Sequence, residues 1–221
     1  MQQIELELAG GGVLTVSLRA SLDAMPAVKQ RPLVLVVPGG GYNHVSPREG
    51  DPVALQFAAA GYHTAVLTYS VGEGAQNYQP LRQLNEALAL LRQNAGEWHI
   101  LPDKIAVCGF SAGGHLALSA AVLDIPGETA QQRPNAVILG YPVITAGEFA
   151  HRGSFVQLAG SATFIGLILT MVCCIILGMG VPTTANYCIM AATCAPILEK
   201  LGVPTCLLYT SPSPRDPKTS R

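Results

Sequence analysis

One serine in this chain stands in a sequence pattern that can perform nucleophilic chemistry. Ser111 is the centre of a G-x-S-x-G motif at residues 109–113, which follows the short apolar run 104–108 and precedes a helical pattern at 114–123. Strand, tight turn and helix in this order form a nucleophile elbow, which exposes the serine hydroxyl above the end of a sheet. The alternative is a chance match in a glycine-rich chain. We favour the elbow, and it predicts acyl transfer through Ser111.

A second glycine-rich segment supplies candidates for the other half of such a site. Residues 38–42 read Pro-Gly-Gly-Gly-Tyr and follow the apolar run 33–37. Acyl transfer passes through a tetrahedral intermediate whose negative oxygen is stabilised by backbone N–H groups. We expect these donors on Gly40, Gly41 and Ala112, and we expect Tyr42 to shape the substrate pocket. The glycines could instead bind phosphate, but the Lys-Ser/Thr ending of a P-loop is absent.

The histidine base that such a serine needs is not evident. In this kind of site the chain order is serine, then an acid, then histidine. Only His115 and His151 follow Ser111. His115 lies four residues along the same predicted helix, where we expect it to pack near the elbow. A Glu148–His151 pair is conceivable, but we favour a surface loop for both residues.

The remaining charged residues are also weak candidates for a catalytic role. Asp124 lies about one helix length beyond the serine, and Asp216 has no histidine after it. His44, Arg48 and Glu49 follow the glycine loop, where they could position a substrate or belong to a solvated loop. We favour the solvated loop. The sequence therefore predicts a nucleophile and an oxyanion hole without the acid and histidine that complete a triad.

The elements around these motifs alternate between strand and helix. Segments 4–8 and 13–18 have the alternation of two strands joined by a glycine turn. The further strands are expected at 33–37, 64–69, 104–108 and 136–139, and helices at 51–60 and 81–95. This β-α-β-α-β order implies a parallel, doubly wound sheet with helices on both faces.

Composition separates the chain into two parts. The net charge is −1, so nothing indicates a nucleic-acid partner. Residues 153–198 contain no charged side chain, and 162–180 are almost all apolar. As a helix, this segment would be about 28 Å long, close to the thickness of a bilayer core. Membrane association through residues 162–203 is therefore expected to be possible, although the rest of the chain has the composition of a soluble domain.

The N-terminal residues and the cysteine spacing indicate the cellular compartment that we expect for the chain. The first eight residues alternate polar and apolar, which is not a signal-peptide pattern. Five of the six cysteines lie beyond residue 170, and Cys173-Cys174 is an adjacent pair in an apolar run. This is not disulfide or zinc-ligand spacing. We expect reduced thiols, a cytoplasmic hydrolase part, and no metal or organic cofactor.

Residues 32–160 resemble the α/β-hydrolase superfamily, and within it the small carboxylesterases and acetyl-xylan-esterase-like enzymes. The matching pieces are residues 38–42, 47–54, 61–62, 69–71, 109–115 and 140–143. The resemblance implies a truncated α/β-hydrolase fold with Ser111 as nucleophile, which cleaves small carboxylic esters, acetyl esters among them. In that superfamily the acid and histidine follow later strands, which are absent here. We therefore expect this form to be inactive or nearly so.

The rest of the chain resembles other sequences. Residues 162–203 resemble the large membrane subunit of TRAP dicarboxylate transporters, and 206–216 resemble a translated sequencing adapter. We interpret the chain as a chimera. Its expected parts are a hydrolase N-terminal portion at 1–160, a foreign apolar helical segment at 161–204 and a disordered tail at 205–221. Two other functions stay open, a fragment of a TRAP-type transporter and a non-catalytic hydrolase-like module.

Overall fold

The computed structural model describes residues 1–20, 29–125, 132–144 and 151–159. The chain divides into two units, Met1–Gly160 and Ser161–Arg221, and every described residue belongs to the first. The expected apolar helical segment and tail therefore lie outside the described residues. In the described part of the chain, no helix has the length and apolar character needed to cross a bilayer.

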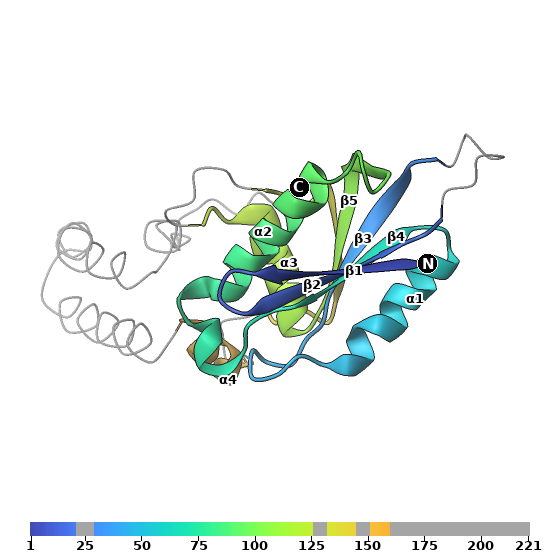
Figure 1. The fold of residues 1–221 in the computed structure, drawn as a ribbon. Helices are drawn as coiled ribbons and strands as arrows, with labels where there is room; N and C mark the ends of the chain where they lie inside the picture. Colours follow the sequence, from blue (N-terminus) through green and yellow to red (C-terminus); the bar gives the residue numbers. More distant parts are fainter. Residues whose placement is uncertain (21–28, 126–131, 145–150, 160–221) are drawn as a thin grey trace, which may run out of the picture. The chain divides into compact units, whose positions relative to one another are not determined.

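A six-stranded sheet forms the centre of the fold (Figure 1), with the order β1-β2-β4-β3-β5-β6. The strands are β1 (Gln2–Leu8), β2 (Gly12–Leu18), β3 (Arg31–Val37), β4 (His63–Thr68), β5 (Ile100–Phe110) and β6 (Ala136–Gly140). Strands β4, β3, β5 and β6 pair in parallel. The carboxyl ends of these parallel strands therefore meet at one edge, where the motif loops follow β3 and β5.

The prediction of a parallel sheet is wrong for β1 and β2. These strands pair antiparallel with each other, and β2 pairs antiparallel with β4, so the sheet is mixed. The cause is the short connection between them, in which Gly10 and Gly11 adopt φ values of 77° and 89°. A tight turn can join only antiparallel neighbours, because a parallel pair needs a long crossover.

Helices cover both faces of the sheet (Figure 1). The helices are α1 (Asp51–Ala59), α2 (Gln79–Gln93), α3 (Ala112–Val122) and α4 (Arg152–Ala159), with short 3-10 helices η2 (Pro47–Glu49) and η3 (Gly72–Tyr78). The sequence predicts α1, α2 and α3 to within a few residues, but it predicts no element where α4 forms. Gly153 and Ser154 have weak helix propensity, and helix formation there depends on packing against η3.

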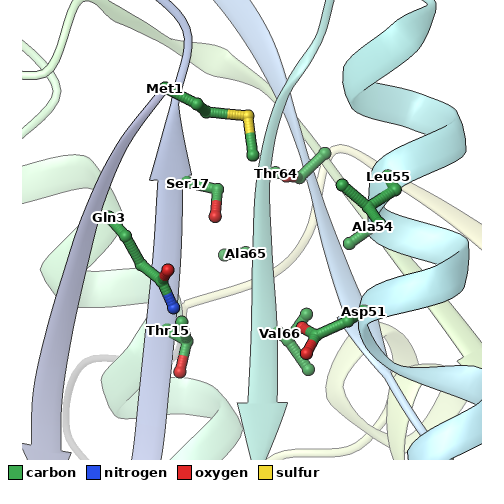
Figure 2. Close-up of a pocket in the computed structure, with 10 residues that line it drawn as sticks. All are labelled: Met1, Gln3, Thr15, Ser17, Asp51, Ala54, Leu55, Thr64, Ala65 and Val66. Atoms are coloured by element: carbon green, nitrogen blue, oxygen red, sulfur yellow. The ribbon is translucent and has the colours of Figure 1, made fainter.

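The face that carries α1 is only partly covered. A cavity of about 230 Å³ opens between α1 and strands β1, β2 and β4 (Figure 2). It is lined by Met1, Gln3, Thr15, Ser17, Asp51, Ala54, Leu55, Thr64, Ala65 and Val66. None of the residues that the sequence assigns to chemistry lines this cavity, so it is not the candidate site.

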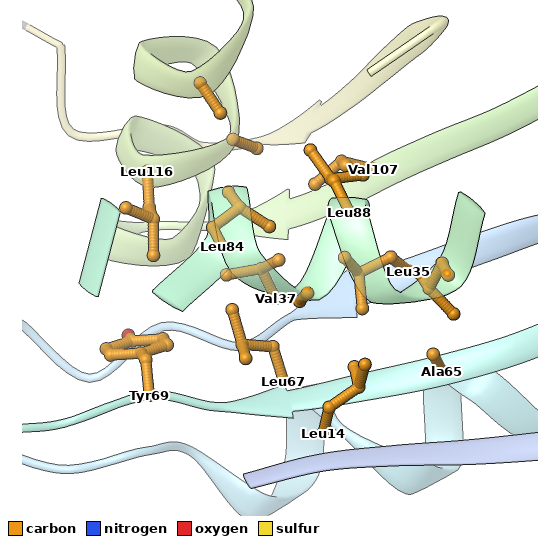
Figure 3. Packing of buried hydrophobic residues seen from close by; sticks show 14 of the residues in the cluster. Leu14, Leu35, Val37, Ala65, Leu67, Tyr69, Leu84, Leu88, Val107 and Leu116 are labelled. Carbon is orange, nitrogen blue, oxygen red and sulfur yellow. The ribbon is translucent and has the colours of Figure 1, made fainter. Parts of the chain in front are cut away.

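Strand β3 shows how the two layers are built. Leu35 and Val37 point into a core shared with α2 and α3 (Figure 3). Val34 and Val36 alternate with them and pack with Ala54 of α1 in a second cluster. All four β3 side chains are at most 3% exposed, as expected for a parallel strand covered on both faces. The prediction of helices on both faces is thereby confirmed.

One histidine is buried at the start of β4. His63 is 2% exposed, and its Nδ1 accepts a hydrogen bond of 3.1 Å from the backbone N–H of Arg19. Its Nε2 has no hydrogen-bond partner among the described residues. Burial lowers the pKa of His63, and the nearby charge of Arg31 lowers it further. The folded protein therefore holds His63 neutral.

We predict that stability falls with pH below the ordinary histidine pKa of about 6.5. In that range the unfolded chain binds a proton that folded His63 resists, so the free energy of unfolding decreases as pH drops. The decrease ends once the pH has passed below the folded pKa. His63→Asn keeps an acceptor near the Arg19 N–H and removes the titration, so it should flatten the pH dependence measured by urea unfolding.

His44→Asn provides the control, since it replaces an exposed histidine that is not part of the core. Partly buried His115 also has a lowered pKa, so it should contribute to the slope that remains in His63→Asn. Identical slopes for wild type and His63→Asn would show that His63 is not the group responsible.

Candidate active site

Ser111 lies between the last residue of β5 and the first residue of α3, with φ 51° and ψ −117°. Side chains other than glycine rarely adopt positive φ, and holding one there costs about 1–3 kcal/mol. Three backbone hydrogen bonds hold this turn. The Ser111 N–H donates to Gly140 O (2.9 Å), and Ser111 O accepts from the N–H groups of His115 (3.0 Å) and Val143 (3.1 Å). The predicted strand-to-helix turn is confirmed.

Both glycines of the motif are required by close backbone contacts. A Cβ on Gly113 would lie 2.1 Å from Val37 O at the end of β3, and one on Gly109 would lie 2.3 Å from Gly113 O. No real Cβ tolerates such distances from backbone atoms. The spacing of the motif thus allows the first turn of α3 to approach β3 and β5 closely.

The glycine loop after β3 lies directly beside Ser111. A Cβ on Gly39 would stand 2.9 Å from Ser111 Cβ and 2.8 Å from Phe110 O. The next two glycines have φ values of 131° (Gly40) and 64° (Gly41), which glycine adopts without strain. The predicted placement of this loop against the serine is confirmed.

Three backbone N–H groups of the two motif loops have no hydrogen-bond acceptor among the described residues. Ala112 is the first residue of α3, so its N–H has no acceptor within the helix. Within the described part of the chain, the N–H groups of Gly40 and Gly41 form no hydrogen bond. The N–H of Gly39, by contrast, donates to the Glu49 carboxylate at 2.7 Å. These three groups are the donors that the sequence predicts for an oxyanion hole.

Two buried tyrosines hold the loop in place. The hydroxyl of Tyr69 donates to Pro38 O at 2.8 Å, and the hydroxyl of Tyr42 donates to Ala112 O at 3.0 Å. Because its single proton goes to that carbonyl, Tyr42 must accept from Nδ1–H of His115, 2.8 Å away. Burial raises the pKa of both tyrosines, so both hydroxyls stay protonated.

Tyr42 itself lies beneath the loop. It is 1% exposed, and its ring packs against those of Tyr69 and His115 at centroid distances of 5.8 and 6.1 Å. Its hydroxyl links the glycine loop to the first turn of α3. This burial favours an influence on the pocket through the loop, and direct contact between Tyr42 and a substrate stays a prediction.

His115 packs near the elbow, as expected. Burial lowers the pKa of His115. Its ring forms a T-shaped pair with that of Phe155 in α4, with the ring centroids 5.7 Å apart. It is neutral, and its Nδ1 proton is donated to Tyr42. These contacts give His115 a packing role in the floor of the site and make it an improbable base.

His151 is an exposed loop residue directly before α4, as expected, and it lies beside the glycine loop. Its Cε1 is 3.6 Å from the position that a Cβ on Gly41 would take, and its Nδ1 is 2.8 Å from the Oγ of buried Ser154. Helix α4 therefore brings His151 next to a predicted oxyanion donor. Glu148 lies outside the described residues, so the Glu148–His151 pairing stays a prediction.

The described acids do not complete a triad. Asp124 pairs with Arg133 at 2.7 Å at the far end of α3 from the serine, with an 86% exposed side chain. Asp216 lies outside the described residues. In the part of the chain that the structure covers, no histidine is hydrogen-bonded to a carboxylate. The interaction that sequence reasoning missed is that of Glu49, a partly buried residue whose carboxylate is hydrogen-bonded to the glycine loop.

A sheet with four parallel strands, a strained serine between β5 and α3, and a glycine loop beside it define an α/β hydrolase. The BD-FAE family model matches residues 23–138, more than half of the chain, and the chain belongs to this family. The fold and superfamily that the sequence resemblance implied are confirmed.

Two curated relatives support this assignment. Endo-1,4-beta-xylanase B of Butyrivibrio fibrisolvens is 35% identical over 147 residues, covering 60% of this chain and 22% of that protein. Acetylxylan esterase of Xylanibacter ruminicola is 33% identical over 129 residues, covering 58% of this chain and 26% of that protein. The chain thus spans about a quarter of the length of the curated relatives it matches.

Solved structures show the same fold. An alpha/beta hydrolase enzyme from a Medee basin deep-sea metagenome library is 42% identical with a TM-score of 0.58, covering 66% of this chain and 60% of that one. The carboxylesterase Cest-2923 from Lactobacillus plantarum WCFS1 is 30% identical with a TM-score of 0.63, covering 73% and 64%. These solved structures share the α/β-hydrolase fold with the described part of this chain.

A second family model overlaps the end of the first. The DctM component of the tripartite ATP-independent periplasmic transporter matches residues 135–208, which includes the segment expected to resemble this family. The structure describes two elements in this range. Strand β6 pairs in parallel with β5, and Leu158 of α4 is buried in the main core. These two elements therefore pack as part of the hydrolase sheet unit.

We predict that Gly113→Ala destabilises the protein by roughly 3 kcal/mol, because its methyl group would collide with the Val37 and Pro38 carbonyls. Urea unfolding of the full chain measures this. Gly96→Ala is the matched control, since no atom lies within 4 Å of its Cβ position. There the loss of unfolded-state freedom should stabilise by about 0.4–1 kcal/mol. Equal effects of the two substitutions would refute the close approach of α3 to β3.

Proposed function

We propose that this chain carries the nucleophile and the oxyanion hole of a serine carboxylesterase. The observation that carries the proposal is the strained turn at Ser111 beside Gly39, where the N–H groups of Gly40, Gly41 and Ala112 have no acceptor among the described residues. A serine at a strand-to-helix turn beside backbone N–H donors is suited to acyl transfer.

The proposed reaction has two halves. The Oγ of Ser111 attacks the ester carbonyl carbon, and the three N–H groups stabilise the resulting oxyanion. Collapse of this intermediate breaks the bond to the alcohol oxygen, which leaves with a proton, and an acyl group remains on Ser111. Water then attacks the acyl carbonyl, which releases the carboxylic acid and restores the hydroxyl.

The proposed substrates are small carboxylic esters, with acetyl esters as the first candidates. Support comes from the relative described as an acetylxylan esterase, and from the carboxylesterase among the solved structures. No organic cofactor or metal is part of the proposed reaction. The alcohol part of the substrate is left open by this proposal.

We predict poor or absent hydrolysis of p-nitrophenyl acetate by this chain, because the described residues include no histidine–carboxylate pair that could deprotonate Ser111. Sites without triad members retain about 10³–10⁴-fold catalysis over water from the oxyanion hole and binding. Ser111→Ala should remove whatever serine-dependent turnover and fluorophosphonate labelling exist.

The result for His151 decides between two versions of the site. Robust turnover that is lost in both Ser111→Ala and His151→Ala would overturn the prediction of inactivity and make His151 the general base. A folded chain whose Ser111 is not labelled at all would instead favour a non-catalytic hydrolase-like module.

A second candidate function is a fragment of a TRAP-type membrane transporter subunit. The match of the DctM component to residues 135–208 favours it, as does the charge-free segment 153–198. Under this proposal residues 162–203 associate with a membrane. The two family matches in series also support the proposal of a chimeric chain.

We predict that the full chain, expressed alone, is insoluble or membrane-associated. The last strand adds exposed apolar area, since Ile138 and Leu139 of β6 are 45% and 36% exposed. Removal of residues 162–221 should restore solubility only in part, because that strand stays uncovered. Fractionation with and without detergent measures this. A soluble, monomeric, cooperatively melting full chain would contradict the chimera proposal.

A further inference from the structure

The carboxylate of Glu49 connects two loops at the edge of the candidate site. Glu49 is the last residue of η2, and its Oε2 accepts the N–H of Gly39 at 2.7 Å. Its Oε1 accepts the hydroxyl of Tyr141 at 2.7 Å. Tyr141 follows β6 directly, so one side chain joins the glycine loop after β3 to the loop after β6.

This carboxylate stands next to the proposed nucleophile. Glu49 Oε2 and Ser111 Cβ both lie 2.9 Å from the point that a Cβ on Gly39 would occupy. The carboxylate therefore reaches the serine from the side of the glycine loop. Its two oxygens are each taken by a donor at the short distance typical of charge-assisted hydrogen bonds.

The hydrogen bond between Glu49 and the Gly39 N–H determines which N–H groups of the glycine loop are available to a ligand. Gly39, Gly40 and Gly41 offer three successive N–H donors, and among the described residues only that of Gly39 has an acceptor. By holding the first, Glu49 fixes the start of the loop and leaves the other two for a ligand. An unpaired carboxylate here would repel a developing oxyanion, and its two donors reduce that repulsion.

Tyr141 is suited to be the second donor. Its side chain is exposed, but its ring packs on Phe110 with centroids 5.8 Å apart. The hydrogen bond to Glu49 raises the pKa of Tyr141, so the hydroxyl stays protonated and continues to donate. The loop after β6 is thus tied to the glycine loop by a neutral donor and a charged acceptor.

We propose that Glu49 is a positioning residue that holds the glycine loop in the conformation that presents the N–H groups of Gly40 and Gly41 to the oxyanion. The effect on loop structure stands by itself, whereas the effect on acyl transfer rests on the proposed function. The two effects can be measured separately in the full chain.

Amide hydrogen exchange of the segment 38–44 tests the effect on the loop. Glu49→Ala should speed exchange of the Gly39 amide by about tenfold or more, the loss expected for a hydrogen bond to a charged group. Glu49→Gln keeps one acceptor and Tyr141→Phe removes one donor, so both should give smaller increases. Asp51→Ala is the matched control, because it removes a carboxylate two positions away and should change nothing.

Fluorophosphonate labelling of Ser111 tests the effect on chemistry. Glu49→Ala should lower the maximal labelling rate by about tenfold and leave the half-saturating probe concentration unchanged, because an oxyanion hole acts in the transition state. Glu49→Gln should recover part of the rate. A purely structural role would leave the maximal rate of the folded variants at the wild-type value, which would overturn the proposal.

Hydrogen exchange and fluorophosphonate labelling together distinguish a failure of the proposed function from a failure of the positioning role. If wild-type Ser111 is not labelled, the proposed function fails, while hydrogen exchange still decides whether Glu49 holds the loop. Exchange in Glu49→Ala equal to that of the wild type would refute the positioning role. If Glu49→Ala does not fold, Glu49→Gln and Tyr141→Phe carry the same comparisons, and unchanged exchange in both would refute it.

Discussion

The close approach of three backbone segments is the constraint on which the rest of the site depends. The end of β3, the end of β5 and the first turn of α3 meet where Gly109 and Gly113 leave no room for a Cβ. This contact forces Ser111 into a positive φ and sets the glycine loop against it. The strain at one residue is offset by hydrogen bonds from the surrounding backbone, because a buried polar group that stays unpaired costs more than a strained turn.

Around this contact, neutral side chains in the interior and one charged side chain nearer to solvent hold the glycine loop. Tyr42 and Tyr69 are buried and His115 is partly buried, and all three are neutral. Their hydrogen bonds join the loop to α3 and, through Pro38, to the residue after β4. Glu49 lies nearer to solvent and takes two donors. This arrangement follows from desolvation, which penalises a charge in the core far more than at the surface.

The same sheet unit also includes residues that resemble another family. Strand β6 and the buried Leu158 of α4 pack on β5 and the main core, although the transporter family model includes them in its match. Ser154 of α4 and His151, which directly precedes that helix, lie against Gly41, so residues of the transporter match border the glycine loop. A sequence similarity reports residue patterns, whereas membership of a folded unit is decided by packing.

The sequence by itself determined the nucleophile turn, the adjacent glycine loop and most of the α/β layers, because apolar periodicity and glycine spacing act locally. It did not determine that the β1–β2 pair joins the sheet antiparallel to β4, since strand direction depends on partner choice. It also missed α4 and the bonds of Glu49. Only the tertiary structure decided these, because Glu49 meets Gly39 and Tyr141 through a chain fold that joins residues ten and ninety-two positions apart. Hydrogen bonds at such separations leave no periodic trace in sequence.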